Sequence, residues 1–425
     1  MKKKKKRKII SLFSGAGGMD LGFIQAGFDI IWANDFNADA VETYKKNLGD
    51  HIILGDISNI DSKLIKGKKY EIDLIIGGFP CQGFSIANKN RSMEDSRNFL
   101  YLEMLRVIND KKPKFFIAEN VKGLLSMQNG KVIQMIKKDF EKIGYKVDYK
   151  ILNAAEYGIP QLRERIIIIG NRLGLENPFP KITHADLFPG EDNYNKIDTK
   201  YLNSGLKPFK TVEETIGFLK DIEIRNQKVI EEIIVEERTI YNHIASTTVK
   251  ESFWGRKYSV DQSKICDYLK YWRAKSKLST KKIDAHFGYK HTAGHWFRKD
   301  NKSGSIPKPS DWWKLKELLK FDDTYDEVVT TFIEKDIKFE QSLRITNWNR
   351  PSDTITATSP EIHINKERRL SARECALLQT FPDNFRFYGS LNSIYRQIGN
   401  AVPVELAKII GLEIINLLNK YEGEK

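Results

Sequence analysis

The chain has 425 residues, 40% of them hydrophobic and 30% charged, and its 70 Lys and Arg against 56 Asp and Glu give a net charge of +14. This length predicts a sizeable core and two domains, and the basic surplus favours a polyanionic partner, nucleic acid before membrane, with a lysine-biased surface as the alternative. No apolar run reaches the length of a membrane span, and no signal-peptide core is present. The 3 cysteines lie far apart, which excludes a disulfide framework and a Cys-rich zinc site. We therefore expect the protein to work in a reducing cytoplasm.

The first part of the chain alternates apolar strands with helical patterns. This order predicts an α/β fold with a doubly wound, Rossmann-like sheet. Strands are expected at 9–13, 29–33, 52–54, 72–76, 115–118 and 166–169, with helices at about 20–26 and 38–47. Ligands bind such sheets at the carboxyl ends of the strands, so the segments that follow the strands are the candidate site.

A glycine loop, FSGAGG at 13–18, follows the first expected strand. Glycines there let the backbone approach a ligand, although the spacing is not the dinucleotide fingerprint G-x-G-x-x-G. Asp35 ends the second strand, where a ribose-binding carboxylate belongs, and Asp56 ends the third, where it could accept a hydrogen bond from an adenine amino group. Either carboxylate could instead cap a helix, Asp35 before 38–41 in particular. The combination favours a nucleoside cofactor without phosphates, such as S-adenosylmethionine.

The string GGFPCQGFS at 77–85 follows the expected strand at 72–76. Most free cysteines are small buried hydrophobes, but Cys81 lies between Pro80 and Gln82 on a stiff loop at the carboxyl edge of the sheet. This setting favours a nucleophile, because a thiolate is intrinsically very nucleophilic.

Two further segments could complete the site. Glu119 follows the strand at 115–118 and could be a solvated cap or, near Cys81, could hydrogen-bond the edge of a bound base. Arg163 and Arg165, in QLRER, share one face of an extended chain and suit a phosphate or a base carbonyl. The alternative is a pair of exposed arginines before a strand.

The alternating pattern ends beyond residue 172. A loop-rich stretch at 177–208 is followed by a charged segment at 211–237 that is expected to be helical, and by a helical block at 262–321. Strand and turn signals return after 344, and residues 403–418 are expected to form an amphipathic helix. Cys375 lies in an expected helix at 371–379 and is assigned to the core.

The helical block resembles a helix-turn-helix. Residues 278–288 would form its first helix, with Ser279 as the N-cap and Gly288 as the stop. Residues 289–298 would form the recognition helix, with Trp296 in the module's core and four side chains facing bases: Lys290, His291, Thr292 and His295. The alternative is a small insertion packed on Trp312 and Trp313. A metal at the two histidines is not expected, because no further ligand is nearby.

Six blocks together resemble the cytosine carbon-5 DNA methyltransferases, and most of all the bacterial restriction–modification enzymes. In order they are FSGAGG, GGFPCQGFS, ENV, QLRER, RRLSARECALLQTFPDNF at 368–385 and IGNAVPVELA at 398–407. The resemblance spans nearly the whole chain except about 173–341, which corresponds in position to the family's variable target-recognition region.

The resemblance implies a role for each matched residue. Cys81 would attack carbon 6 of a cytosine, Glu119 would contact its ring nitrogen 3 and exocyclic amine, and Arg163 and Arg165 would hold the base or its flanking backbone. The cofactor S-adenosylmethionine, which leaves as S-adenosylhomocysteine, would be bound by Phe13, Gly15, Gly17, Gly18, Asp35, Asp56, Pro80, Asn400 and Val402. Ser85, Arg350 and Thr354 would join the four side chains of the recognition helix in contacting DNA.

We therefore expect a DNA (cytosine-5-)-methyltransferase that acts on a flipped cytosine in a short duplex sequence. Its catalytic domain would comprise 1–175 with 392–425, and its target-recognition domain 176–391. We expect a monomer in the cytoplasm that associates with the nucleoid and needs neither a metal nor a membrane. It would be the partner of a restriction endonuclease, or else an orphan or phage methylase. The alternatives are an RNA cytosine methyltransferase of the same fold and an inactive DNA-binding regulator, and the helix-turn-helix could also repress the protein's own promoter.

Overall fold

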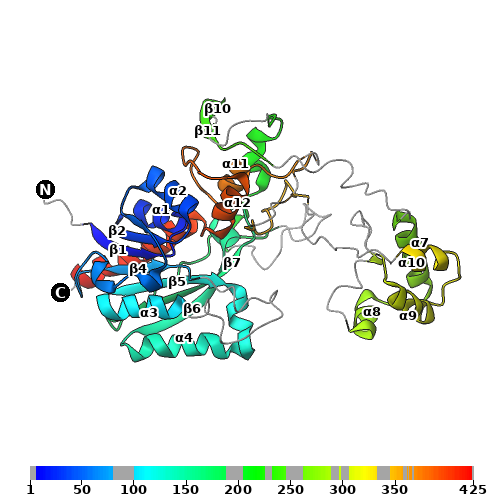
Figure 1. The fold of residues 1–425 in the computed structure, drawn as a ribbon, viewed down its shortest axis with the longest axis horizontal. Helices are drawn as coiled ribbons and strands as arrows, with labels where there is room; N and C mark the ends of the chain where they lie inside the picture. Colours follow the sequence, from blue (N-terminus) through cyan, green and yellow to red (C-terminus); the bar gives the residue numbers. More distant parts are fainter. Residues whose placement is uncertain are drawn as a thin grey trace. The chain divides into compact units, whose positions relative to one another are not determined.

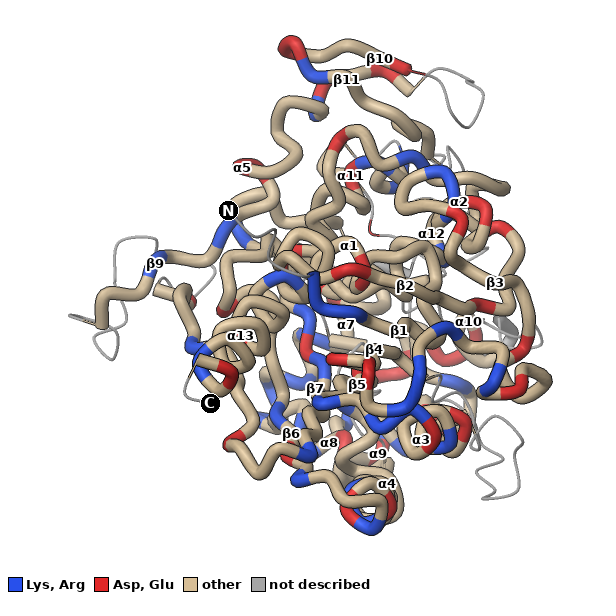
Figure 2. Tube along the Cα trace, turned by 90° about the vertical axis from the view of Figure 1, so that its left-hand side faces the viewer, with Lys and Arg blue, Asp and Glu red and all other residues tan. Residues whose placement is uncertain are grey.

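The computed structural model describes residues 6–79, 100–187, 204–224, 232–245, 262–288, 296–297, 306–332, 345–357, 361, 363–365 and 368–423 (Figure 1). The chain divides into two compact units. The first comprises Met1–Ser246, Thr346–Ile364 and Leu370–Lys425, and the second comprises Thr247–Ile345 and Asn365–Arg369. Lys and Arg are spread along the elements of both units (Figure 2).

A seven-stranded sheet forms the centre of the first unit, in the order β3-β2-β1-β4-β5-β7-β6. The strands β1 to β5 pair in parallel, whereas β7 pairs antiparallel with both β5 and β6. This confirms the predicted doubly wound α/β fold. The bounds are β1 Arg7–Leu12, β2 Phe28–Asp35, β3 Ile52–Leu54, β4 Leu74–Gly77, β5 Phe115–Val121, β6 Lys146–Asn153 and β7 Glu164–Asn171.

Helices cover both faces of this sheet (Figure 1). Successive strand residues point to opposite faces, so in β4 Leu74 and Ile76 pack in one hydrophobic cluster and Ile75 packs in the other. The first cluster includes side chains of α1 and α13, and the second those of α3 and α4. The bounds of the helices around the sheet are α1 Gly18–Gln25, α2 Ala38–Leu48, α3 Leu100–Lys111, α4 Lys131–Lys142 and α13 Val404–Gly423.

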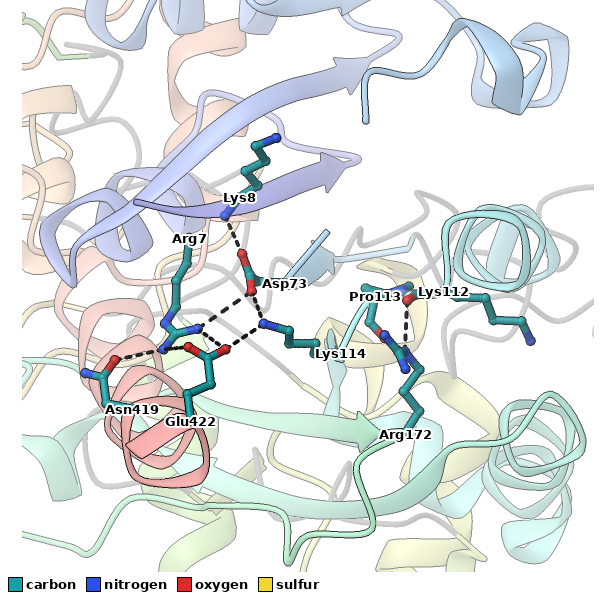
Figure 3. Close-up of polar contacts among 9 residues, drawn as sticks. All are labelled: Arg7, Lys8, Asp73, Lys112, Pro113, Lys114, Arg172, Asn419 and Glu422. Atoms are coloured by element: carbon teal, nitrogen blue, oxygen red, sulfur yellow. Dashed lines mark hydrogen bonds and ion pairs between the residues drawn. The ribbon is translucent and has the colours of Figure 1, made fainter. Parts of the chain in front are cut away.

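A charge network joins α13 to the amino ends of the strands (Figure 3). Arg7 at the start of β1 and Lys114 just before β5 both contact Glu422, at 3.0 and 2.7 Å. Asp73, which precedes β4, accepts from Lys114 at 2.8 Å and lies 3.7 Å from Arg7. The last helix is thereby attached to three strands, at the edge of the sheet opposite the candidate site.

Shorter elements complete the first unit. They are η1 Ile57–Asn59, η2 Ser62–Leu64, η5 Lys122–Gly130, η6 Ala154–Tyr157, β8 His184–Ala185, β9 Lys207–Pro208, α5 Val212–Ile216, η8 Gly217–Leu219, β10 Glu232–Val235, β11 Arg238–Tyr241, α11 Ala372–Leu378 and α12 Leu391–Asn400. The expectation of one helix over 211–237 is wrong. The described part holds the short α5 and η8, and then a hairpin whose turn residues Glu236 and Glu237 have φ of 47° and 62°, a left-handed conformation that a helix does not contain. Cys375 is buried in α11, as predicted.

The second unit is helical and has its own core. Its helices are α7 Gln262–Lys275, α8 Thr280–Phe287, α9 Pro309–Leu319 and α10 Asp326–Phe332. Ser279 caps α8 by accepting from the Lys282 amide, and Gly288 ends it with φ 69°, both as predicted. Trp296 and Trp312 are buried in this core, while Trp313 is 47% exposed. The assignment of 176–391 to target recognition concerns function, and it stays a prediction.

Candidate active site

The glycine loop connects β1 to α1 in a conformation that few residues can adopt. Phe13, Gly15 and Gly17 have φ of 55°, 56° and 91°, in the left-handed region that favours glycine. A Cβ built on Gly15 would meet nothing within 4 Å, so open space lies beside the loop. The loop can therefore bring its backbone close to a ligand.

Asp35, at the end of β2, is attached to this loop. Its carboxylate accepts from the backbone amides of Gly15 and Asn37, each at 2.8 Å. Burial raises the pKa of Asp35 above its ordinary value. The alternative role as a helix cap belongs instead to Asn37, whose side chain accepts from the Ala40 amide at 3.0 Å.

Asp56 lies in a different setting, because it caps the short helix η1. One carboxylate oxygen accepts from the amide and the hydroxyl of Ser58, at 2.9 and 2.8 Å. This oxygen is engaged by Ser58, and Asp56 as a whole is exposed to solvent. The capping role and a hydrogen bond to a ligand through the second oxygen are compatible.

Phe36 was not predicted as a site residue. It follows Asp35 directly at the carboxyl edge and is 71% exposed. An aromatic side chain left in water beside a buried carboxylate offers a flat apolar surface for a ring. Its position after Asp35 at the end of a strand was the available signal in the sequence.

The C-terminal part of the chain closes one side of the glycine loop. A Cβ on Gly18 would lie 2.9 Å from the carbonyl oxygen of Val402 and 3.0 Å from the Cβ of Ala401. Val402 is buried, and Asn400, the last residue of α12, is exposed. Val402 thus lies against Gly18, while the closing of a cofactor pocket by Asn400 and Val402 stays a prediction.

Glu119 and Arg165 form an ion pair at the carboxyl end of β5. The Arg165 Nε lies 2.9 Å from the Glu119 Oε1, and β5 and β7 bring them together because Val121 and Arg165 are register partners. Glu119 is 8% exposed, so the pair is largely shielded from water. The arginine fixes the orientation of the carboxyl group while leaving its second oxygen available.

Asn120 was also not singled out from the sequence. Its side-chain amide donates to the carbonyl of Phe79 at 3.0 Å, and it is 3% exposed. Phe79 directly precedes Pro80 and Cys81 in the chain. Asn120 therefore fixes the point at which the chain leaves the sheet toward the predicted nucleophile.

The structure places Arg163 where it cannot play its predicted role of holding a base. Its guanidinium donates to the carbonyls of Ile355, Gly399 and Ala401 at 3.0, 2.9 and 2.9 Å, and it is 1% exposed. Burial lowers its pKa to about 9. It has no free surface with which to hold a base, so we correct its role to that of a structural link between the start of β7 and the C-terminal segments.

Two glutamines reinforce this link. Gln161 donates to the Leu378 carbonyl at 3.3 Å and accepts from the Ile355 amide at 3.0 Å. Gln379 donates to the Ile398 carbonyl at 2.8 Å. The network joins the segment before β7 to α11, to α12 and to the chain around Ile355.

A polar cavity of about 430 Å³ opens beside Arg165. Its lining includes Lys122, Asn153 and Thr354, and the Thr354 hydroxyl donates to the Leu162 carbonyl at 2.7 Å. Arg350, predicted to contact DNA, is paired with Asp186 at 2.8 Å. Thr354 thus faces the cavity that holds Arg165, whereas Arg350 already has an anionic partner.

Several predicted site residues lie outside the described residues: Pro80, Cys81, Ser85, Lys290, His291, Thr292 and His295. Among the residues that are described, no cluster of three or more His, Cys, Asp or Glu could hold a metal ion. Within the same ranges no helix is long and apolar enough to cross a membrane.

The described residues fit a nucleoside cofactor. The open space beside Gly15, the Asp35 carboxylate and the exposed ring of Phe36 follow adjacent strands at one edge of the sheet. An adenosine that bears a sulfonium group requires a backbone that it can approach closely, a hydrogen-bond acceptor and a flat surface on which its base can stack.

Known proteins resemble this chain over most of its length. A family model for the C-5 cytosine-specific DNA methylases matches residues 7–416. The Type II methyltransferase M.NgoFVII of Neisseria gonorrhoeae is 34% identical over 99% of this chain and 92% of its own length. M.FnuDI of Fusobacterium nucleatum, another Type II methyltransferase, is 31% identical over 98% of this chain and 97% of its own length. In fold, the S. pombe Dnmt2 methyltransferase superposes with a TM-score of 0.51 at 16% identity, covering 98% of this chain and all of the other.

Proposed function

Since the chain belongs to the C-5 cytosine-specific DNA methylase family, we propose that it transfers a methyl group from S-adenosylmethionine to carbon 5 of a flipped cytosine in a specific short sequence of duplex DNA. The observation that best supports this is the Glu119–Arg165 pair, 2.9 Å apart at the carboxyl edge of the sheet. A carboxyl group held in this way can bind the nitrogen edge of a base.

In the proposed reaction, the Cys81 thiolate forms a bond to carbon 6 of the cytosine. Electron density moves to carbon 5, and Glu119 stabilises the change at ring nitrogen 3, where it holds or shares a proton. The cofactor supplies the methyl group to carbon 5. A base then removes the carbon 5 proton, the bond from sulfur to carbon 6 breaks, and Cys81 is released as the thiolate.

The cytosine must leave the duplex for this reaction, because neighbouring bases cover both faces of its ring. Flipping costs a few kcal/mol, which contacts in the pocket must offset. We assign Arg165, Thr354 and the cavity beside them to the flipped nucleotide and its flanking backbone. Ser85, in the loop after Cys81, is assigned to the space that the base vacates.

For the cofactor we assign the glycine loop and Asp35 to the methionine and ribose parts. Asp56 would accept from the adenine amine through the oxygen that Ser58 does not use. Phe36, at 71% exposure, would stack on the adenine. Val402 would close the side of the loop that it already contacts, with Asn400 beside it.

Sequence recognition is assigned to residues 176–391, which include the helical second unit. The four candidate base-reading side chains, Lys290, His291, Thr292 and His295, and also Arg350, are proposals that rest on the helix-turn-helix pattern. A net charge of +14 should make DNA binding steeply dependent on salt, because each phosphate contact releases counterions.

In the cell we propose that the enzyme acts as a monomer in the cytoplasm, on nucleoid DNA. M.NgoFVII and M.FnuDI carry the name of Type II methyltransferases, so a restriction endonuclease with the same target is the partner we propose.

Bisulfite sequencing tests the function directly. A methylation-free host would express the wild type or Cys81→Ala, and its DNA would be sequenced after bisulfite treatment. We expect modified cytosines in one short motif with the wild type and none with the variant. Retained binding of S-adenosylhomocysteine would show that Cys81→Ala is folded. Unmodified DNA from well-expressed wild type would refute the DNA-enzyme proposal, and methylated RNA would then favour the RNA alternative.

A further inference from the structure

A buried carboxylate lies beneath the glycine loop and has no part in the proposed chemistry. Asp20, in the first turn of α1, is fully buried. Its two oxygens accept from the Ser11 hydroxyl and from the Tyr44 hydroxyl, each at 2.7 Å. This carboxylate therefore connects α2 to β1 and α1, the two elements that the glycine loop joins.

Tyr44 carries the connection from Asp20 to the loop. Its ring packs against Gly17, because a Cβ on Gly17 would lie 2.9 and 3.1 Å from the Tyr44 Cδ2 and Cε2. Gly17 is the N-terminal cap residue of α1 and has φ 91°. The Tyr44 ring limits where Gly17 can lie together with the Leu48 Cδ1, which would be still closer to that Cβ, and Gly17 sets the direction of the first amides of α1.

The hydroxyl of Tyr44 has a second partner in His51, whose Nε2 lies 2.9 Å away. Tyr44 has one hydroxyl proton, which it donates to the ionised Asp20, so His51 must donate its Nε2–H to the Tyr44 oxygen. The hydrogen bonds then run in one direction, from His51 through Tyr44 to Asp20. This holds the Tyr44 hydroxyl from two sides.

Packing alone gives no reason for a carboxylate at this position. Burial raises the pKa of Asp20 to about 6, because the ionised form loses its hydration. An apolar side chain of similar size would avoid that loss. What the carboxylate adds is a directed hydrogen bond to Tyr44.

We propose that Asp20 and Tyr44 are positioning residues for the cofactor, which hold Gly17 and the glycine loop in the conformation that binds the S-adenosyl group. Neither side chain reaches the ligand, and both act through the backbone of the loop. The proposal rests on the proposed function, because it takes S-adenosylmethionine as the ligand of this loop.

The test compares two tyrosines that each lose one hydroxyl group. Tyr44→Phe keeps the ring and removes the hydrogen bonds to Asp20 and His51. The control is Tyr145→Phe, because Tyr145 is also buried and donates to the Pro113 carbonyl at 2.8 Å, apart from the glycine loop. The measurement is the Kd for S-adenosylhomocysteine by titration calorimetry without DNA, with the melting temperature of each variant.

We expect Tyr44→Phe to raise this Kd at least fivefold and Tyr145→Phe to leave it within twofold of the wild type. With saturating cofactor, the kcat of Tyr44→Phe should stay within threefold of wild type while its KM for S-adenosylmethionine rises. Asp20→Asn provides a second variant, whose amide still accepts from Ser11 but no longer from Tyr44, and its Kd should also rise at least threefold.

Two results would overturn the inference, and they differ in what else they affect. If the wild type binds S-adenosylhomocysteine and both Tyr44→Phe and Asp20→Asn match the Tyr145→Phe control, the positioning role is refuted and the proposed function stands. If the wild type does not bind S-adenosylhomocysteine, the proposed cofactor and the positioning role fail together.

Discussion

Replacing Arg163 by lysine separates a structural role from a chemical one. The guanidinium reaches three carbonyl oxygens, those of Ile355, Gly399 and Ala401, at 2.9 to 3.0 Å. A lysine keeps the charge, but its single nitrogen lies on a different path and cannot serve three acceptors spread over a planar fork. At least one buried carbonyl should lose its partner, at about 1–3 kcal/mol each.

We therefore expect Arg163→Lys to lower the free energy of unfolding by about 1–6 kcal/mol, since one or two carbonyls lose their donor at about 1–3 kcal/mol each. Urea unfolding without DNA measures this loss. Below the unfolding transition, the kcat of the folded fraction should fall less than threefold, because the Glu119–Arg165 pair is unchanged.

Arg165→Lys is the matched control, since it makes the same substitution two residues away. It should cost about 1–2 kcal/mol in stability, because lysine keeps a positive charge opposite the shielded Glu119 carboxylate, and should lower kcat at least tenfold. The reasoning would be refuted if Arg163→Lys were as stable as the wild type and lost activity as Arg165→Lys does. Arg163 would then act on the base, as its position in QLRER first indicated.

Two further predictions concern the C-terminal segment. Arg7 and Lys114 lower the pKa of Glu422 to about 2, so Glu422→Gln should cost about 1 kcal/mol or less at neutral pH, since screening weakens a pair that is nearly half exposed. A carboxyl group whose pKa is lower in the folded than in the unfolded protein stabilises the fold at pH values above its unfolded-state pKa. This stabilisation is lost as the pH falls through its folded-state pKa. The urea midpoints of wild type and variant should therefore differ by a constant amount above about pH 5 and converge toward pH 2. Gly18→Ala would place its Cβ 2.9 Å from the Val402 carbonyl oxygen, and it should cost about 1–3 kcal/mol and raise the Kd for S-adenosylhomocysteine; an unchanged Kd would show that Val402 does not shape the loop.

The sequence predicted the sheet well where strands are covered on both faces. Runs such as Ile166–Ile169 are apolar throughout and are buried in β7. The edge strand β6 was not predicted, because Lys146–Asn153 mixes buried and exposed residues and carries two lysines and an aspartate. A strand with one partner needs fewer apolar residues, so its pattern is weaker.

Site residues were predictable where each lies in a recognisable motif, as Glu119 does in ENV and Arg165 in QLRER. Glu119 and Arg165 lie on paired strands, and the structure brings them together. Arg163 was misassigned because its acceptors are 192 to 238 residues away in the chain, and no local pattern reveals them. Asp20 and Tyr44 were overlooked because each lies within a helix pattern, where nothing in the sequence indicates that the two side chains meet.

The contact of Gly18 with Val402 also has a consequence for biosynthesis. The glycine loop leaves the ribosome early, but α13 and the segment before it pack on α1 and are translated only after the whole of the second unit. Domains generally fold as they are synthesised, yet this one lacks a wall of its loop until residues 398–423 arrive. We therefore expect the nascent chain to expose the apolar face of α1 during elongation, and methylation of DNA to begin only once translation has passed α13.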